Sequence, residues 1–294
     1  MSGPAVSPRP AELRSAAQRR AAVAATFDQV ADGYDQGGVR WFAPIARRLV
    51  GLLAPRRGER ALDLGCGRGA VLFELAAAVG EHGSVTGIDL APRMIEATGA
   101  DARARGMANV DLRVMDAAAP ALPPSSYHLA AASFVLFFLP APVAALRAWR
   151  RLLVPGGRLG VSSYDQDEAG LLGDVFQPYL PSPAFRPASP FGSEEGVAQA
   201  MRASGFTAVR TLSFDLTVAF TDADEWYAWS WSHGQRAVWE RIPLAERGQV
   251  RAAVAGRLAQ ARGPDGRLQL TQRIRLTTGC NKDQQPPDSE GAGR

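Results

Sequence analysis

The chain has 294 residues, a length that fits one large domain with an extra segment better than two full domains. Hydrophobic residues make up 46% of it, enough for a large core, and no run of 18 apolar residues is present, which excludes a transmembrane helix. The net charge of +4 comes from scattered arginines without a continuous basic stripe, so we expect neither a membrane nor a nucleic acid as partner.

The two ends of the chain have the composition of tails. Residues 1–25 are rich in Ala, Pro, Ser and Arg, and residues 281–294 are polar and rich in Pro and Gly. We expect both segments to be flexible, the first of them disordered or loosely helical. Cys66 lies inside a glycine-rich loop where a disulfide would obstruct a ligand, so the cysteines indicate a reducing, cytoplasmic location.

From residue 60 to residue 164, strand-like and helix-like segments alternate. The strands are short and nearly continuously apolar, and the helices end at glycine, as a parallel sheet covered on both faces requires. This rhythm predicts an α/β fold with a doubly wound sheet. We expect strands at 60–66, 84–90, 110–117, 127–138 and 157–164, and helices at 70–79, 92–106 and 143–153.

After residue 164 the rhythm changes, first to a polar, proline-rich stretch. Two longer helices before the last strand predict a helical lid over residues 221–264, inside a domain that spans residues 26–280. The elements expected here are a short helix around 168–176, a helix at 193–205 with Ser193 as N-cap, one or two strands at 206–220, a helix from Thr221 to before Pro243, a helix at 244–262 and a strand at 267–279.

The stretch ALDLGCGRGA (61–70) is a nucleotide-binding loop by its pattern. It also fits the G-x-G-x-x-A motif of dinucleotide enzymes, so an NAD-dependent dehydrogenase is a rival interpretation. Asp63, just before the loop, would repel a pyrophosphate and attract a ligand ammonium group. Asp89 and Asp116 end the next two strands, where they can bind ribose hydroxyls and an adenine amino group. Three such acids suit S-adenosylmethionine (SAM).

Several motifs resemble those of class I SAM-dependent methyltransferases, most closely the small-molecule group related to ubiquinone and menaquinone biosynthesis. They are FDQVADGYD, ALDLGCGRGA, VTGIDLAPRMIEAT, VMDAAA, VLFFLPAP and RLLVPGGRLGVSSY, and the resemblance covers residues 27–210 and the final strand. It implies a Rossmann-like, seven-stranded, mostly parallel sheet whose last strand is antiparallel. One departure is Phe137 and Phe138, where relatives often carry His.

The resemblance also implies a cofactor site. The methionine end of SAM would face the glycine loop, the ribose would lie at the end of the second strand, and the adenine at the end of the third. The residues implied are Tyr34, Asp63, Gly65, Gly67, Asp89, Leu90, Met94, Asp116, Ala117 and Ser133.

The candidate acceptor side depends on aromatic residues and one histidine. Trp226, Trp229 and His233 are spaced i, i+3, i+7 and would share a helical face, with His233 as the candidate general base. Trp41 and Tyr164 are further candidate substrate contacts near the carboxyl ends of the strands. Core packing of a lid is the alternative explanation for Trp226 and Trp229, and packing of the N-terminal helix is the alternative for Trp41.

The sequence therefore predicts methyl transfer to an O, N or C nucleophile of a small molecule, an aromatic or apolar specialised metabolite. SFVLFFLP stands where amino-methyltransferases of nucleic acids carry D/N-P-P-Y/F, which disfavours base methylation. No metal ligand set is recognisable. A peptide natural product as substrate, an inactive SAM-binding scaffold and a homodimer all stay open.

Overall fold

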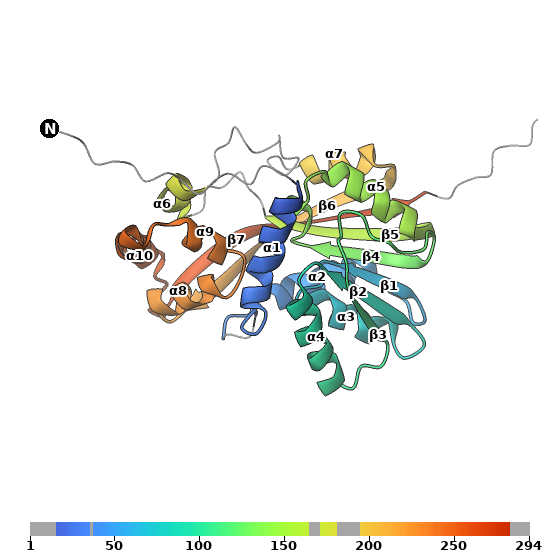
Figure 1. The fold of residues 1–294 in the computed structure, drawn as a ribbon, viewed down its shortest axis with the longest axis horizontal. Coiled ribbons are helices and arrows are strands. Elements are labelled where there is room, and N and C mark those ends of the chain that lie inside the picture. The colour runs from blue at the N-terminus through green and yellow to red at the C-terminus, as the bar shows by residue number, and fades with distance from the viewer. Residues whose placement is uncertain (1–15, 36–37, 165–170, 181–194, 283–294) are drawn as a thin grey trace, which may run out of the picture.

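The computed structural model describes residues 16–35, 38–164, 171–180 and 195–282, and within them one sheet of seven strands (Figure 1). The strand order is β3-β2-β1-β4-β5-β7-β6, with β7 antiparallel to both of its neighbours and the first five strands parallel. This confirms the predicted doubly wound, mostly parallel sheet. The strands are β1 (Arg60–Leu64), β2 (Ser84–Asp89), β3 (Val110–Val114), β4 (Tyr127–Ser133), β5 (Leu153–Tyr164), β6 (Phe206–Phe220) and β7 (Leu268–Asn281).

Helices cover both faces of the sheet. One core lies between the sheet and α2 and α3, and a second lies between the sheet and α5 and α7. Strands with both faces covered must be apolar on both, which explains the continuous apolar runs. The helices are α1 (Ala16–Val30), α2 (Phe42–Leu53), α3 (Ala70–Val79), α4 (Pro92–Ala104), α5 (Pro142–Leu152), α6 (Gly173–Phe176), α7 (Gly196–Ala203), α8 (Ala223–Trp231), α9 (Arg236–Arg241) and α10 (Leu244–Leu258), with 3₁₀ turns η1 (Leu136–Phe138), η2 (Gln177–Tyr179) and η5 (Ala259–Ala261). None of the described helices is long and apolar enough to cross a membrane.

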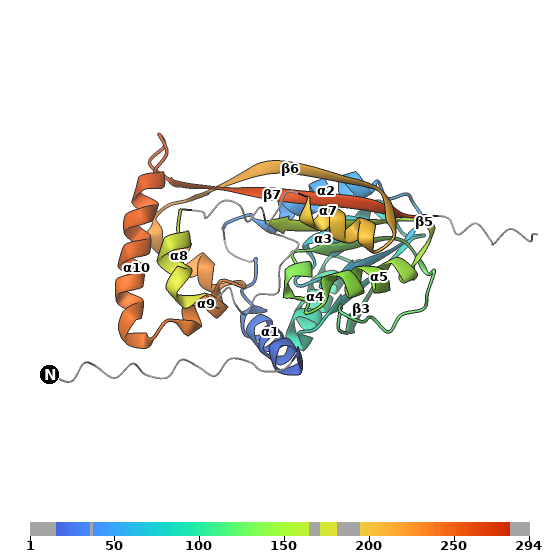
Figure 2. The same ribbon diagram turned by 90° about the horizontal axis from the view of Figure 1, so that it is seen from above.

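The last two strands continue well past the rest of the sheet. β5 pairs with β7 only as far as Tyr164 opposite Ile274, whereas β6 and β7 stay paired out to Phe220 opposite Leu268. Beyond Tyr164 they form a two-stranded ribbon, which we call the arm. Figure 2 shows the arm running from the sheet to α8, α9 and α10. These three helices lie between β6 and β7 in the chain, where the lid was expected.

The structure corrects three predicted elements. The strand expected at 127–138 ends at Ser133, because Phe134 has a positive φ of 56° that extended backbone does not allow. The helix expected from Thr221 to before Pro243 is broken: α8 ends at Trp231, and His233 lies in the turn before α9. Residues 16–25, expected in a tail, form the first part of α1. Ser193 and residues 168–170 lie outside the described residues.

Candidate active site

The glycine loop follows β1 and turns the chain sharply into α3. Gly65, Gly67 and Gly69 have φ values of 72°, 48° and 81°, which L side chains rarely adopt. A Cβ atom at Gly65 would also overlap a methyl group of Val135. The loop is therefore glycine-rich because its backbone is left-handed and closely packed, and the N–H groups of Gly65, Gly67 and Gly69 are hydrogen-bonded within the protein.

Asp63 is the most unusual acid of the loop region. Its side chain is 1% exposed, and its Oδ2 atom has no hydrogen-bond partner among the described residues. Burial, together with the nearby charge of Asp89, raises the pKa of Asp63 to about 8. The carboxyl lines a small cavity of about 40 Å³ with Tyr34 and Ser133. A buried carboxyl with one unpartnered oxygen, lining a small cavity, fits the ammonium group of an amino-acid ligand.

Asp89 and Asp116 both stand in the wall of a large pocket, at the ends of β2 and just after β3. Asp89 accepts hydrogen bonds from the N–H groups of Gly67 and Ala91, each at 2.9 Å, which fixes the orientation of its carboxylate against the loop. Asp116 accepts one from the Ala118 N–H at 2.8 Å and pairs with Arg20 of α1 at 3.0 Å.

The other residues expected at the cofactor site divide into two groups. Leu90, Ala117, Ser133 and Tyr34 line the large pocket together with Gly65 and Gly67. Met94 does not: it is fully buried and packs with Val30, Ala31 and Ala91 under Phe27 and Tyr34. In this structure Met94 supports the wall formed by α1 and does not face the pocket.

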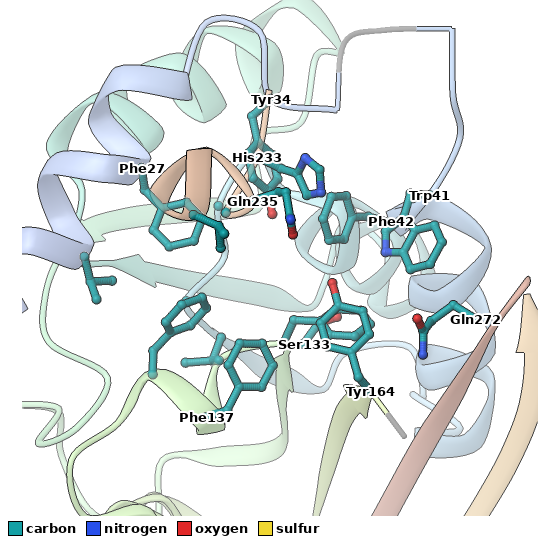
Figure 3. A pocket seen from close by; sticks show the side chains of 18 of the residues that line it. Phe27, Tyr34, Trp41, Phe42, Ser133, Phe137, Tyr164, His233, Gln235 and Gln272 are labelled. Atoms are coloured by element: carbon teal, nitrogen blue, oxygen red, sulfur yellow. The ribbon is translucent and has the colours of Figure 1, made fainter. Parts of the chain in front are cut away.

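The large pocket, about 810 Å³, continues from these acids into an aromatic chamber (Figure 3). Its volume lies high in the range of small-molecule sites, as a pocket that holds two ligands requires. Trp41 is central to the chamber, with ring centroids 5.7 Å from Trp229 and 6.4 Å from Tyr164. Among the described lining residues, the charged side chains are Arg20, Asp89 and Asp116, all at the end that holds the strand-end acids. The described walls of the chamber itself are uncharged.

His233 lines the chamber although it lies outside α8. Its Nδ1 atom is 2.9 Å from the Trp229 carbonyl, and because a carbonyl only accepts, Nδ1 must carry the proton. The Nε2 atom is then a hydrogen-bond acceptor. Burial lowers the pKa of His233 to about 4, so the ring is neutral at neutral pH. The structure thus brings His233 to the pocket, but as a weaker base than an ordinary histidine.

The predicted aromatic contacts all line the pocket, though not equally. Trp41, Tyr164 and Trp229 surround the chamber, whereas Trp226 is 4% exposed and also packs against Phe176 and Trp239. Burial raises the pKa of Tyr164 to about 12, so its hydroxyl stays protonated. Both interpretations weighed for the tryptophans, pocket wall and core packing, therefore apply to Trp226.

Several pocket residues were not identified in the sequence. Arg20 was missed because the composition of residues 1–25 resembles a tail. Phe134 was counted as part of a strand. Gln272 could have been identified from the sequence, since it interrupts an alternating apolar pattern in β7, whereas no sequence pattern marks Gln235 as a site residue. No group of three or more metal-ligating side chains occurs within the described ranges.

Comparison with known proteins finds relatives that are methyltransferases. Residues 61–157 match the family described as Methyltransferase domain. Nocamycin O-methyltransferase from Saccharothrix syringae is 37% identical over 270 residues, which is 86% of this chain and 96% of that protein. Aklanonic acid methyltransferase from Streptomyces sp. (strain C5) is 45% identical over 168 residues, 57% of this chain and 73% of that protein.

Solved structures agree on the fold. A putative methyltransferase from Bacillus halodurans superposes with a TM-score of 0.58 at 14% identity, covering 81% of this chain and 98% of that one. From the length and identity of the sequence match, the chain belongs to the class I SAM-dependent methyltransferases, and S-adenosylmethionine is its cofactor.

Proposed function

We propose that this enzyme methylates an anionic oxygen, a carboxylate or phenolate, of an apolar ring-containing specialised metabolite. Nocamycin O-methyltransferase supports oxygen as the acceptor atom, and the name of aklanonic acid methyltransferase supports an acidic substrate. The aromatic chamber supports a flat, apolar ring system, because aromatic walls bury large apolar surfaces.

The observation that carries the proposal is the lack of charged side chains around the chamber, within the described lining residues. When bound, SAM supplies an electrophilic methyl group on a sulfonium cation. Among the described lining residues of this chamber, an acceptor anion finds no cation to bind, so it is drawn toward the sulfonium. Transfer then removes both charges. Since an anionic oxygen carries no proton, the reaction requires alignment and exclusion of water more than a base.

The cofactor residues are assigned by position. Asp63 binds the ammonium group, while Tyr34, Gly65, Gly67 and Ser133 surround the rest of the methionine end. Asp89 and Leu90 contact the ribose, and Asp116 and Ala117 the adenine. Asp63 supports the first assignment with its unpartnered oxygen, and the fixed carboxylate of Asp89 supports the second.

The acceptor residues orient the substrate. Trp41, Tyr164, Trp226 and Trp229 form the walls, and the Nε2 atom of His233 accepts a hydrogen bond from a substrate hydroxyl. The lowered pKa of His233 favours this role over that of a strong base. We also propose that residues 221–264 act as a lid. The catalytic domain extends beyond the expected residues 26–280, because α1 begins at Ala16 with Arg20 in the pocket lining and β7 ends at Asn281. The enzyme acts on free small molecules in the cytoplasm, not on nucleic acid.

The test is methyl transfer to a matched pair of acceptors. Purified enzyme with SAM is incubated with anthraquinone-2-carboxylic acid or with 2-(hydroxymethyl)anthraquinone, which has the same rings but an alcohol, and products are identified by mass spectrometry. A set of ring carboxylic acids and phenols is run alongside. We expect methyl esters or ethers of the acidic compounds and no product from the alcohol. Equal transfer to the alcohol, methylation at carbon, or no transfer to any acid or phenol would contradict the proposal.

A further inference from the structure

One polar residue interrupts the apolar inner face of the arm. Alternate residues of β7 share a face, and on the side toward the pocket these are Leu268, Leu270, Gln272, Ile274 and Leu276. Leu268, Ile274 and Leu276 are almost completely buried, and Leu270 is packed against the core. Gln272 is thus a single carboxamide in a leucine and isoleucine stripe.

The neighbouring strand does not satisfy this carboxamide. Gln272 stands opposite Leu216, and the flanking residues of β6 on the same face are Phe214 and Val218. The hydrogen bond that Gln272 makes among the described residues is a long one, 3.4 Å, from Nε2 to the carbonyl of Arg273 next to it. A half-buried amide between apolar side chains costs stability unless it gains a better partner.

The carboxamide lies at the pocket. Gln272 is a lining residue, and Figure 3 shows its side chain beside that of Tyr164. A second carboxamide, Gln235, lines the same pocket from the turn before α9 and makes no side-chain hydrogen bond within the described residues. Gln269 and Thr271 of the arm also line the pocket, but they alternate with Gln272 along β7 and are exposed on its other face. Gln272 is therefore the amide of the inner face of the arm, and Gln235 is the amide that the lid contributes.

We propose that Gln272, assisted by Gln235, determines specificity by binding a neutral ring oxygen of the acceptor, a carbonyl or hydroxyl remote from the oxygen that is methylated. A neutral amide can donate a hydrogen bond to a carbonyl and accept one from a hydroxyl, so it can bind either group. The acceptor class is then a flat ring system with an acidic group at one end and carbonyl or hydroxyl oxygens elsewhere. This inference rests on the proposed function for the site of the acidic group.

The test compares two probes that differ only in ring oxygens. Anthraquinone-2-carboxylate has two ring carbonyls, and anthracene-2-carboxylate has none. Their dissociation constants are measured by calorimetry with enzyme saturated with sinefungin, a SAM analogue that carries a protonated amine in place of the sulfonium group. We expect wild-type enzyme to bind the quinone at least tenfold more tightly, and Gln272→Leu to reduce this preference to less than threefold, because an unpaired buried polar group discriminates strongly.

The controls separate recognition from folding. Leucine continues the stripe of β7, so Gln272→Leu should melt at the same temperature or higher and bind S-adenosylhomocysteine as wild type does. Gln199→Leu, at an exposed position of α7, should leave the preference unchanged. Gln235→Leu should lower it partly. If Gln272→Leu keeps the full preference for the quinone, this inference alone is wrong. If neither probe binds wild-type enzyme, the proposed function is contradicted, and the inference with it.

Discussion

At the scale of one residue, the buried carboxyl of Asp63 gives the proposed cofactor site a test by pH. Its pKa of about 8, raised first by burial and then by Asp89, means that the ligand-free enzyme holds a proton there at pH 7. A ligand ammonium beside it favours the ionised form and lowers the pKa again. Binding and proton release are therefore coupled at this residue.

We predict that S-adenosylhomocysteine binding releases up to one proton at pH 7, and that affinity rises as the pH increases from about 5 to about 8. The sign follows because the proton bound below pH 8 must leave before the carboxylate can pair. Calorimetry in phosphate and in Tris, whose ionisation enthalpies differ, measures the release. Asp63→Asn should abolish it, and Asp111→Asn, at an exposed position of β3, should not. Equal heats in both buffers would refute the assignment of Asp63.

His233 provides a second test at the scale of one side chain. With a pKa of about 4 it stays neutral from pH 5.5 to pH 8, so the turnover rate should show no inflection from it in this range. We predict that His233→Asn, which keeps an N–H for the Trp229 carbonyl but loses Nε2, raises KM for the acceptor several-fold with little change in kcat. A fall in kcat of about 100-fold or more, with KM unchanged, would instead establish His233 as a general base.

At the scale of the element, the lid helices α8 and α9 pack around an aromatic core that also includes Phe176 of α6. Trp239 is fully buried, contacts the rings of Phe176, Tyr227 and Trp231, and donates from Nε1 to the hydroxyl of Ser230 at 2.8 Å. Trp239 does not line the pocket, so it supports the chamber wall from behind.

We predict that Trp239→Ala loosens the lid without impairing the cofactor site. Truncation of a buried tryptophan costs about 3–5 kcal/mol, which is enough to destabilise a small helical unit. Proteolysis should cleave the lid segment faster, and affinity for anthraquinone-2-carboxylate should fall more than tenfold. The dissociation constant of S-adenosylhomocysteine should stay within twofold, and a parallel loss of cofactor affinity would show that the lid and the cofactor site are not separable.

Elements were more predictable than the points where they end. The periodic segments of β1 to α4 were placed almost to the residue, since their apolar pattern and glycine stops are local. The end of β4 depends on the left-handed Phe134, and the break after α8 depends on the hydrogen bond of His233 to Trp229. Neither feature changes the hydrophobic period, so neither could be seen in the sequence.

At the scale of the whole molecule, the site depends on contacts between distant segments. Arg20 forms a salt bridge with Asp116, and Gln272 of the last strand lines the pocket. These residues lie in parts of the chain that no single motif connects. The cofactor acids were predictable because the carboxyl ends of parallel strands meet at one edge. The acceptor chamber was predictable only in part: its tryptophans, Tyr164 and His233 were identified, but Gln235 and Gln272 were not, because the lid and the arm bring them there only through the tertiary fold.

The division of charge across the pocket leads to a prediction for the complete complex. Sinefungin carries a protonated amine in place of the sulfonium group, whereas S-adenosylhomocysteine is neutral there. Two opposite charges about 4 Å apart attract each other by about 1 kcal/mol in water and about 4 kcal/mol near a protein surface, where the effective dielectric constant is lower. We predict that anthraquinone-2-carboxylate binds the sinefungin complex about tenfold more tightly, and that raising the salt concentration changes this ratio little. Equal affinity in both complexes would contradict the sulfonium as the partner of the acceptor anion.

The arm joins the lid to the sheet at a defined position. Pairing to β5 stops at Tyr164 opposite Ile274, and beyond this point the described parts of β6 and β7 pair only with each other. The proposed cofactor contacts lie on the sheet side of this position, together with Trp41 and Tyr164, whereas Gln272, Gln235 and the lid aromatics lie beyond it. Substrate range can therefore drift in evolution by substitutions in the arm and lid, while the half of the molecule that activates the methyl group stays unaltered.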